Sequence, residues 1–172
     1  WILIKASGQG RRGSGFDNPE ERGMSERCIV IGTNGPPFGN YLYNNNFQIV
    51  QTKDNFVVMS EMIHDTRIAP IGGKFSDKAS DQYMGHSVAH WDGDTMVVET
   101  KGLRPGSGAF VSDKGVISER FTRISDDQIL YEFEVNDPTN CVAMPFTIGL
   151  PATCDFPLNK FTSPLMLPLV TS

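Results

Sequence analysis

Tyr83-Met-Gly-His-Ser-Val-Ala-His-Trp-Asp-Gly-Asp-Thr-Met-Val-Val-Glu-Thr100 is the stretch that decides the fold. Two runs with the alternation of β-strands flank Asp92-Gly93, a dipeptide that readily takes the positive φ angles of a type I′ turn. The stretch therefore predicts a tight β-hairpin. If Asp92-Gly93 forms the whole loop, His86 pairs with Glu99 on the neighbouring strand.

Strand alternation divides this hairpin into an apolar face and a more polar face. Because large aromatic side chains on apolar faces are usually buried, we predict that Trp91 anchors the core rather than stacking on a ligand. The polar face holds two of the three histidines of the chain. The apolar face consists of Ser87, Ala89, Trp91, Met96 and Val98, and the polar face of His86, Val88, His90, Thr95, Val97 and Glu99.

The rest of the chain predicts an all-β fold. A second hairpin is expected, formed by a strand from Phe47 to Thr52 and a long strand from Phe56 to Ile68. A third is expected from Val116 to Ile124 and Ile129 to Val135, and Met144 to Leu150 suits one more edge strand. About seven or eight strands with hairpin connections favour an antiparallel β-sandwich or a β-barrel.

Composition predicts one domain with an extended arm at each end. A chain of 172 residues with 39% hydrophobic content can bury a core of its own. Residues 1–18 are expected to form an N-terminal arm or linker, in which a short apolar, strand-like piece at 1–5 precedes a stretch rich in Gly, Ser and Arg at 6–18, and 19–155 form a single β domain. Residues 156–172 are apolar without periodicity, so we expect an extended arm that docks on this domain or on a partner. Asn18 and Pro19 suit the start of one helical turn.

Charge and hydropathy exclude several classes of function. The net charge is −5 and both signs are interspersed, so no basic surface for nucleic acid is expected. No apolar run approaches the roughly 20 residues of a membrane-spanning helix. We found no motif for a phosphate loop, a nucleophile elbow or a zinc protease, so no cofactor is predicted. The first residue is Trp, so a processed chain or a fragment is expected, and a removed signal peptide would place the protein outside the cytoplasm, in the periplasm or secreted.

The three cysteines and the paired histidines argue against a metal site. Cys28, Cys141 and Cys154 are widely spaced and include no Cys-x-x-Cys. In an oxidising compartment we expect one disulfide, from Cys28 to one of the later cysteines, with three free thiols as the alternative. His86 and His90 lie about 13 Å apart along one strand, too far to share an ion, so no metal is predicted.

Acid/base chemistry is the one catalytic class that the sequence leaves open. Histidine beside a carboxylate can relay a proton near neutral pH, and His64 with Glu61 or Asp65 offers that combination. On a strand, however, neighbouring residues point to opposite faces, and an acidic pair beside an arginine more often forms a solvated ion-pair row. The candidate catalytic residues are Glu61, His64, Asp65, Arg67, His86 and Glu99.

Five stretches in the same order carry a family resemblance: Tyr43 to Thr52, Glu61 to Arg67, Met84 to Thr100, Glu119 to Arg123 and Val135 to Pro138. The series resembles a large family of uncharacterised, usually exported bacterial proteins over roughly residues 18–150. The resemblance implies export and a β-rich domain, and it assigns no activity and no catalytic residue.

The resemblance also ranks the cysteines and the histidines. Cys28 matches a family cysteine that precedes the first motif, and Cys154 falls near the position of a second, so the resemblance favours a disulfide between them. Because the residues around Cys154 depart from the family pattern, Cys141 remains the alternative partner. His64 lies within a family motif, whereas His86 occupies a position that varies, so shared chemistry would favour His64.

Two functional hypotheses follow. The first is a non-catalytic, exported binding or assembly subunit whose partners are other protein subunits or further copies of this chain. The second is a small acid/base enzyme, such as an isomerase, lyase or hydrolase, that uses His64 with a nearby carboxylate on a small-molecule ligand in a β-lined cavity.

Overall fold

The structure of the 172-residue chain is a computed structural model. It describes residues 18–31, 34–38, 46–76, 82–104 and 111–138, and the backbone of 161–165. The predicted strand from Met144 to Leu150 lies outside these residues, as do positions 1–17 of the N-terminal arm. Within the described part of the chain, no helix has the length and apolar character needed to span a bilayer.

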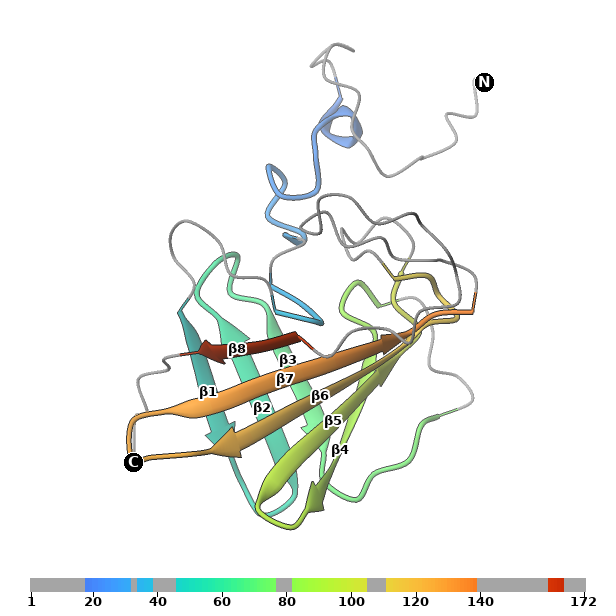
Figure 1. The fold of residues 1–172 in the computed structure, drawn as a ribbon. Coiled ribbons are helices and arrows are strands. Elements are labelled where there is room, and N and C mark those ends of the chain that lie inside the picture. The colour runs from blue at the N-terminus through green and yellow to red at the C-terminus, as the bar shows by residue number, and fades with distance from the viewer. Residues whose placement is uncertain are drawn as a thin grey trace, which may run out of the picture.

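Two antiparallel sheets make up the body of the molecule, which confirms the all-β prediction (Figure 1). The small sheet has the order β1-β2-β3, with strands at Phe47–Gln51, Asn55–Ser60 and Thr66–Pro70. The large sheet has the order β4-β5-β6-β7-β8. Its strands are His86–Asp92, Thr95–Lys101, Val116–Arg123, Ile129–Asn136 and, within the predicted C-terminal arm, Phe161–Leu165.

The sheets pack face to face and are joined along one side. A parallel bridge between Ile71 and Ala89 connects the end of β3 to β4, so the strand order continues from one sheet into the other. Inward side chains from both sheets form one hydrophobic core, as strand alternation requires. Buried members of that core include Phe47, Phe56, Val58 and Ala69 from the small sheet and Met96, Val98, Ile117, Phe121, Tyr131 and Phe133 from the large sheet.

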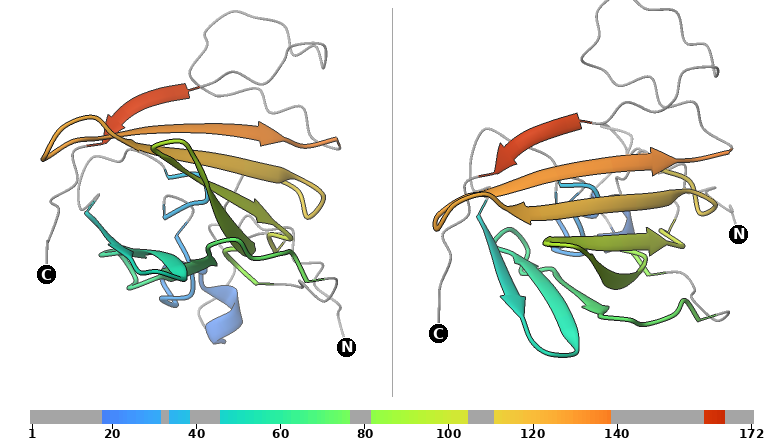
Figure 2. Two further views of the ribbon diagram at one scale, coloured as in Figure 1. Left: turned by 90° about the horizontal axis from the view of Figure 1, so that it is seen from below. Right: turned by 60° about the horizontal axis from the view of Figure 1, so that its bottom comes forward.

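A loop segment, residues 34–38, fills the space between the sheets (Figure 2). Its even-numbered residues are buried, and the ring of Phe38 lies 4.4 Å from that of Phe47 on β1 and 5.3 Å from that of Tyr131 on β7, between centroids. Aromatic contacts of this kind contribute beyond simple area burial. The segment therefore links the two sheets through the core.

The central hairpin forms as predicted, but its register differs. The loop is Gly93-Asp94, Asp92 pairs with Thr95, and His86 pairs with Lys101, so the predicted pairing of His86 with Glu99 is wrong. Gly93 takes a φ of 60°, which fits a type II′ turn with Gly at the first central position. Because the shift is by two residues, both faces keep the predicted members.

Trp91 is not the buried anchor that its apolar face predicted. It is 48% exposed, whereas Met96, its partner across the hairpin, is 2% exposed. Trp91 lies one residue pair from the hairpin loop. An inward-facing residue so close to the end of the strand is only partly covered by the opposite sheet.

The long strand predicted from Phe56 to Ile68 is wrong as a single element. β1 and β2 form the predicted hairpin, but β2 ends at Ser60, and a turn at residues 61–65 leads back into β3. At the start of the described chain, η1 at Pro19–Glu21 is a single 3₁₀ turn that begins after Asn18, close to the predicted helical turn.

Candidate functional site

A buried ion pair joins the two sheets at the centre of the molecule. Arg67 on β3 and Glu119 on β6 form a two-point contact, in which Nη1 donates to Oε2 and Nη2 donates to Oε1 at 3.0 Å. Glu119 is fully buried and Arg67 is 5% exposed. The guanidinium also lies over the ring of Phe38, 5.1 Å from its centroid.

Further polar side chains of the large sheet extend this pair into a network. The Tyr131 hydroxyl donates to Glu119 Oε1 at 2.8 Å and accepts from the backbone N–H of Phe38 at 3.0 Å. Arg67 Nη1 also donates to Thr100 Oγ1 at 3.3 Å, and Thr100 shares a 2.8 Å hydrogen bond with Ser87. We call Arg67, Glu119, Tyr131, Thr100 and Ser87 the buried network.

The electrostatics of the buried network favour a structural role. Burial first, and the Glu119 carboxylate second, raise the pKa of Tyr131 well above its usual value, so its hydroxyl remains a donor at neutral pH. Both oxygens of Glu119 accept hydrogen bonds. A fully buried carboxylate whose oxygens both face donors binds the sheets together, whereas a general base must reach its substrate.

Three of the predicted catalytic residues lie in the turn between β2 and β3. The Glu61 carboxylate accepts a hydrogen bond from Asn46 at 2.6 Å, and His64 is exposed. Ile63 and His64 both have positive φ angles, 65° and 62°. The strand faces predicted for this region therefore do not exist, and of the residues proposed there only Arg67 points into the core.

Asp65, at the end of this turn, is held by the segment that fills the core. The side-chain nitrogen of buried Asn34 donates to the backbone oxygen of Met62 at 2.6 Å and to Asp65 Oδ2 at 3.4 Å. Partial burial raises the pKa of the Asp65 carboxyl, and the Asn34 contact offsets part of that rise. These contacts attach the turn to the 34–38 segment.

His86 and Glu99 lie on the outer face of the large sheet. His86 pairs with Lys101 and Glu99 with Val88, so the two candidates are not directly opposite each other. The ring of His86 lies 5.9 Å from that of Phe75, and its Nδ1 is buried without a hydrogen-bond partner in the described structure. The structure thus places the six candidates in three places: the β2–β3 turn, the core and this outer face.

Neither a disulfide nor a metal site is seen among the described residues. Cys28 is an exposed free thiol in the structure, and both Cys141 and Cys154 lie outside the described residues, so the disulfide remains a prediction. Among the residues that can be described, no group of three or more His, Cys, Asp or Glu side chains is placed to hold a metal ion.

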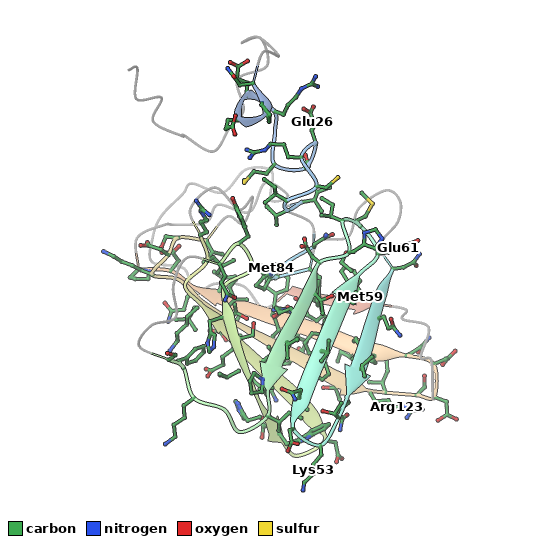
Figure 3. The ribbon with its side chains drawn as sticks, turned by 180° about the vertical axis from the view of Figure 1, so that it is seen from behind. Glu26, Lys53, Met59, Glu61, Met84 and Arg123 are labelled. Carbon is green, nitrogen blue, oxygen red and sulfur yellow. The ribbon has the colours of Figure 1, made fainter. Side chains whose placement is uncertain are left out.

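The outer face of the small sheet carries a row of apolar side chains. Val50, Val57 and Ile68 lie side by side in register on β1, β2 and β3, and Val50 and Ile68 are 43% and 58% exposed. Figure 3 looks onto this face, with Met59 labelled on β2 and Lys53 and Glu61 at opposite ends of the sheet. We call the outward residues of β1–β3 the apolar face. They are Gln48, Val50, Asn55, Val57, Met59, Thr66, Ile68 and Pro70.

Sequence reasoning named neither Glu119 nor the apolar face as a site. Glu119 shares one face of β6 with Ile117 and Phe121, a pattern that marks a buried carboxylate in need of a cation. The apolar face could be found in the same way, because Val57 and Met59 alternate with Phe56 and Val58 and leave β2 apolar on both sides.

Comparison of the chain with family models, curated proteins and solved structures gives no significant match.

Proposed function

We propose that this chain is a non-catalytic binding or assembly subunit that works outside the cytoplasm and binds protein through the apolar face. The observation that supports this most is the row of Val50, Val57 and Ile68, in which Val50 and Ile68 are exposed and Val57 between them is half-buried. Contiguous exposed apolar side chains with polar residues at their rim mark protein interaction surfaces. Here the rim is supplied by Gln48 and Thr66, which are exposed on the same face.

The buried network supports the same proposal from the interior. Arg67 and Glu119 belong to two of the stretches that carry the family resemblance, and both serve to join the sheets. These two charged residues are thereby explained by architecture, so the resemblance does not require a shared reaction. Export rests on the resemblance itself, and cell fractionation of the native host tests it directly.

The direct test is recovery of partners by the tagged full-length chain in its native host after mild cross-linking. We expect protein partners to be retained by the wild type and lost with Ile68→Glu. Ile124→Glu is the matched control, because Ile124 is 54% exposed but follows β6, outside the apolar face. If wild type and Ile68→Glu retain the same proteins, or neither retains any, the proposed function fails.

A second candidate, the acid/base enzyme, is favoured by one observation. Ile63 and His64 are consecutive non-glycine residues with positive φ, and strained backbone of this kind clusters at functional sites. His64 is also exposed, so a ligand could reach it. The residue would act as the proton acceptor, with Asp65 as the neighbouring carboxylate.

Turnover decides between the two candidates. A thermal-shift screen of small carbonyl and ester compounds identifies ligands, and each hit is assayed for conversion with wild type, His64→Ala and His64→Gly. The enzyme hypothesis requires both variants to lose conversion while remaining folded. Conversion that survives in both variants, or no conversion by the wild type, rejects it.

A further inference from the structure

The apolar face carries no charged side chain. All eight of its outward residues are uncharged, although the whole chain has a net charge of −5. Charged residues begin only at its two ends, with Lys53 and Asp54 in the β1–β2 turn and Glu61 and Asp65 in the β2–β3 turn. A strongly charged partner would therefore gain no ion pairs across this face.

We infer that the partner of the apolar face is a second copy of this chain, packed against it around a two-fold axis; this rests on the proposed function and names its partner. Two copies of a negatively charged chain repel each other, and the uncharged face is where they can meet without facing like charges. In such an isologous contact the same patch serves both copies, so it must be complementary to itself.

The register of the small sheet provides that complementarity. Val57 lies on the middle strand, with Val50 on one side and Ile68 on the other, in a single cross-strand row. Packed sheets keep their strand directions within about 30°, so the two-fold axis runs nearly along or nearly across the strands. With either axis through the centre of the row, Val57 meets Val57 of the second copy.

The size of the face sets the strength of the dimer. Three strands spaced about 4.8 Å apart, each with about five residues rising about 3.3 Å, give a face of roughly 14 by 17 Å. That is well below the roughly 800 Å² per partner of a standard stable interface. The dimer is therefore weak and reversible, and it forms only at high protein concentration.

Sedimentation velocity of the full chain, from about 1 to 500 µM, tests the inference. We expect the wild type and Ile124→Glu to shift toward dimer as concentration rises. Ile68→Glu should weaken association at least tenfold, because it buries a carboxylate in an apolar contact. Ile68 and Ile124 are similarly exposed, at 58% and 54%, so both variants should keep the wild-type circular dichroism spectrum and melting temperature.

The possible outcomes separate this inference from the proposed function. A wild type that stays monomeric throughout overturns the second copy as partner, and so does an Ile68→Glu variant that dimerises like the wild type. If the wild type is monomeric but binds a different protein, and the Ile68→Glu variant no longer binds that protein, the proposed function stands and the inference fails. If the Ile68→Glu substitution reduces neither self-association nor binding of another protein, both the inference and the proposed function are rejected.

Discussion

At the scale of single residues, Arg67 and Glu119 form a charged pair buried between the two sheets. Both are buried, and each satisfies the other through two parallel hydrogen bonds. Desolvation of two charges offsets much of their attraction, so the pair itself adds little net stability. Removal of one partner is different, because it leaves the other charge buried and uncompensated.

We therefore predict non-additive effects at this pair. Arg67→Met or Glu119→Leu alone should lower the free energy of unfolding by about 3 to 5 kcal/mol, whereas the double variant should lose less than the sum. Urea denaturation measures all three. Arg120→Ala, which removes the exposed ion pair with Asp92, is the control and should change stability far less. Additive losses at Arg67 and Glu119 would contradict this account of the network.

Tyr131 makes stability sensitive to alkaline pH. Its pKa is raised in the folded protein, so it contributes no pH dependence below its unfolded value of about 10, where both states are protonated. Above that pH the unfolded state loses the proton first, and stability falls as pH rises toward the folded pKa. Unfolding free energies between pH 8 and 11 should fall less steeply in Tyr131→Phe than in the wild type. Equal slopes would show that Tyr131 does not titrate in this way.

At the scale of elements, strand alternation predicts faces far better than it predicts register or contacts. The members of both hairpin faces are confirmed although the pairing is shifted, because a two-residue shift preserves the period. The sequence does not predict the break after Ser60, because the residues from Glu61 to Asp65 continue a strand-like pattern. In the turn that follows β2, Ile63 and His64 have positive φ angles. Such angles are uncommon for residues other than glycine, so the residue types at these positions do not predict the turn.

The buried ion pair between Arg67 and Glu119 could not be predicted from local sequence patterns, for a different reason. Arg67 and Glu119 are 52 residues apart, and their contact depends on how the two sheets stack. Seen on its own strand, Arg67 resembles a solvated residue beside acidic neighbours. The position of Glu119 between Ile117 and Phe121 on one face of β6 indicates a buried carboxylate, but it does not identify the partner.

The entry to β4 provides a test of close packing at an element boundary. Gly85 and Gly72 both have positive φ, 67° and 72°, so alanine is strained at either position. A Cβ on Gly85 would lie 2.7 Å from the backbone oxygen of Lys101, whereas one on Gly72 would meet nothing within 4 Å. Gly72→Ala should therefore cost about 1 kcal/mol and Gly85→Ala clearly more, as measured by thermal unfolding. Equal losses would mean that the backbone can move aside at Gly85.

At the scale of the whole molecule, the two sheets have different roles. The large sheet supplies most of the core and four of the five residues of the buried network. The small sheet is apolar on both sides, with its inner side in the core and its outer side exposed at Val50 and Ile68. We therefore propose that the small sheet binds the partner, while the contact between the sheets holds the fold together.

A charge-complementation experiment at Val57 tests the central claim most directly. Val57→Lys and Val57→Glu each place like charges face to face across the two-fold axis, so each alone should be monomeric. Mixed in equal amounts, with one variant isotope-labelled, they should form heterodimers that native mass spectrometry detects at concentrations where the wild type dimerises. Monomers alone and heterodimers on mixing are the predicted result. A mixture that stays monomeric, or single variants that dimerise as the wild type does, would contradict the account.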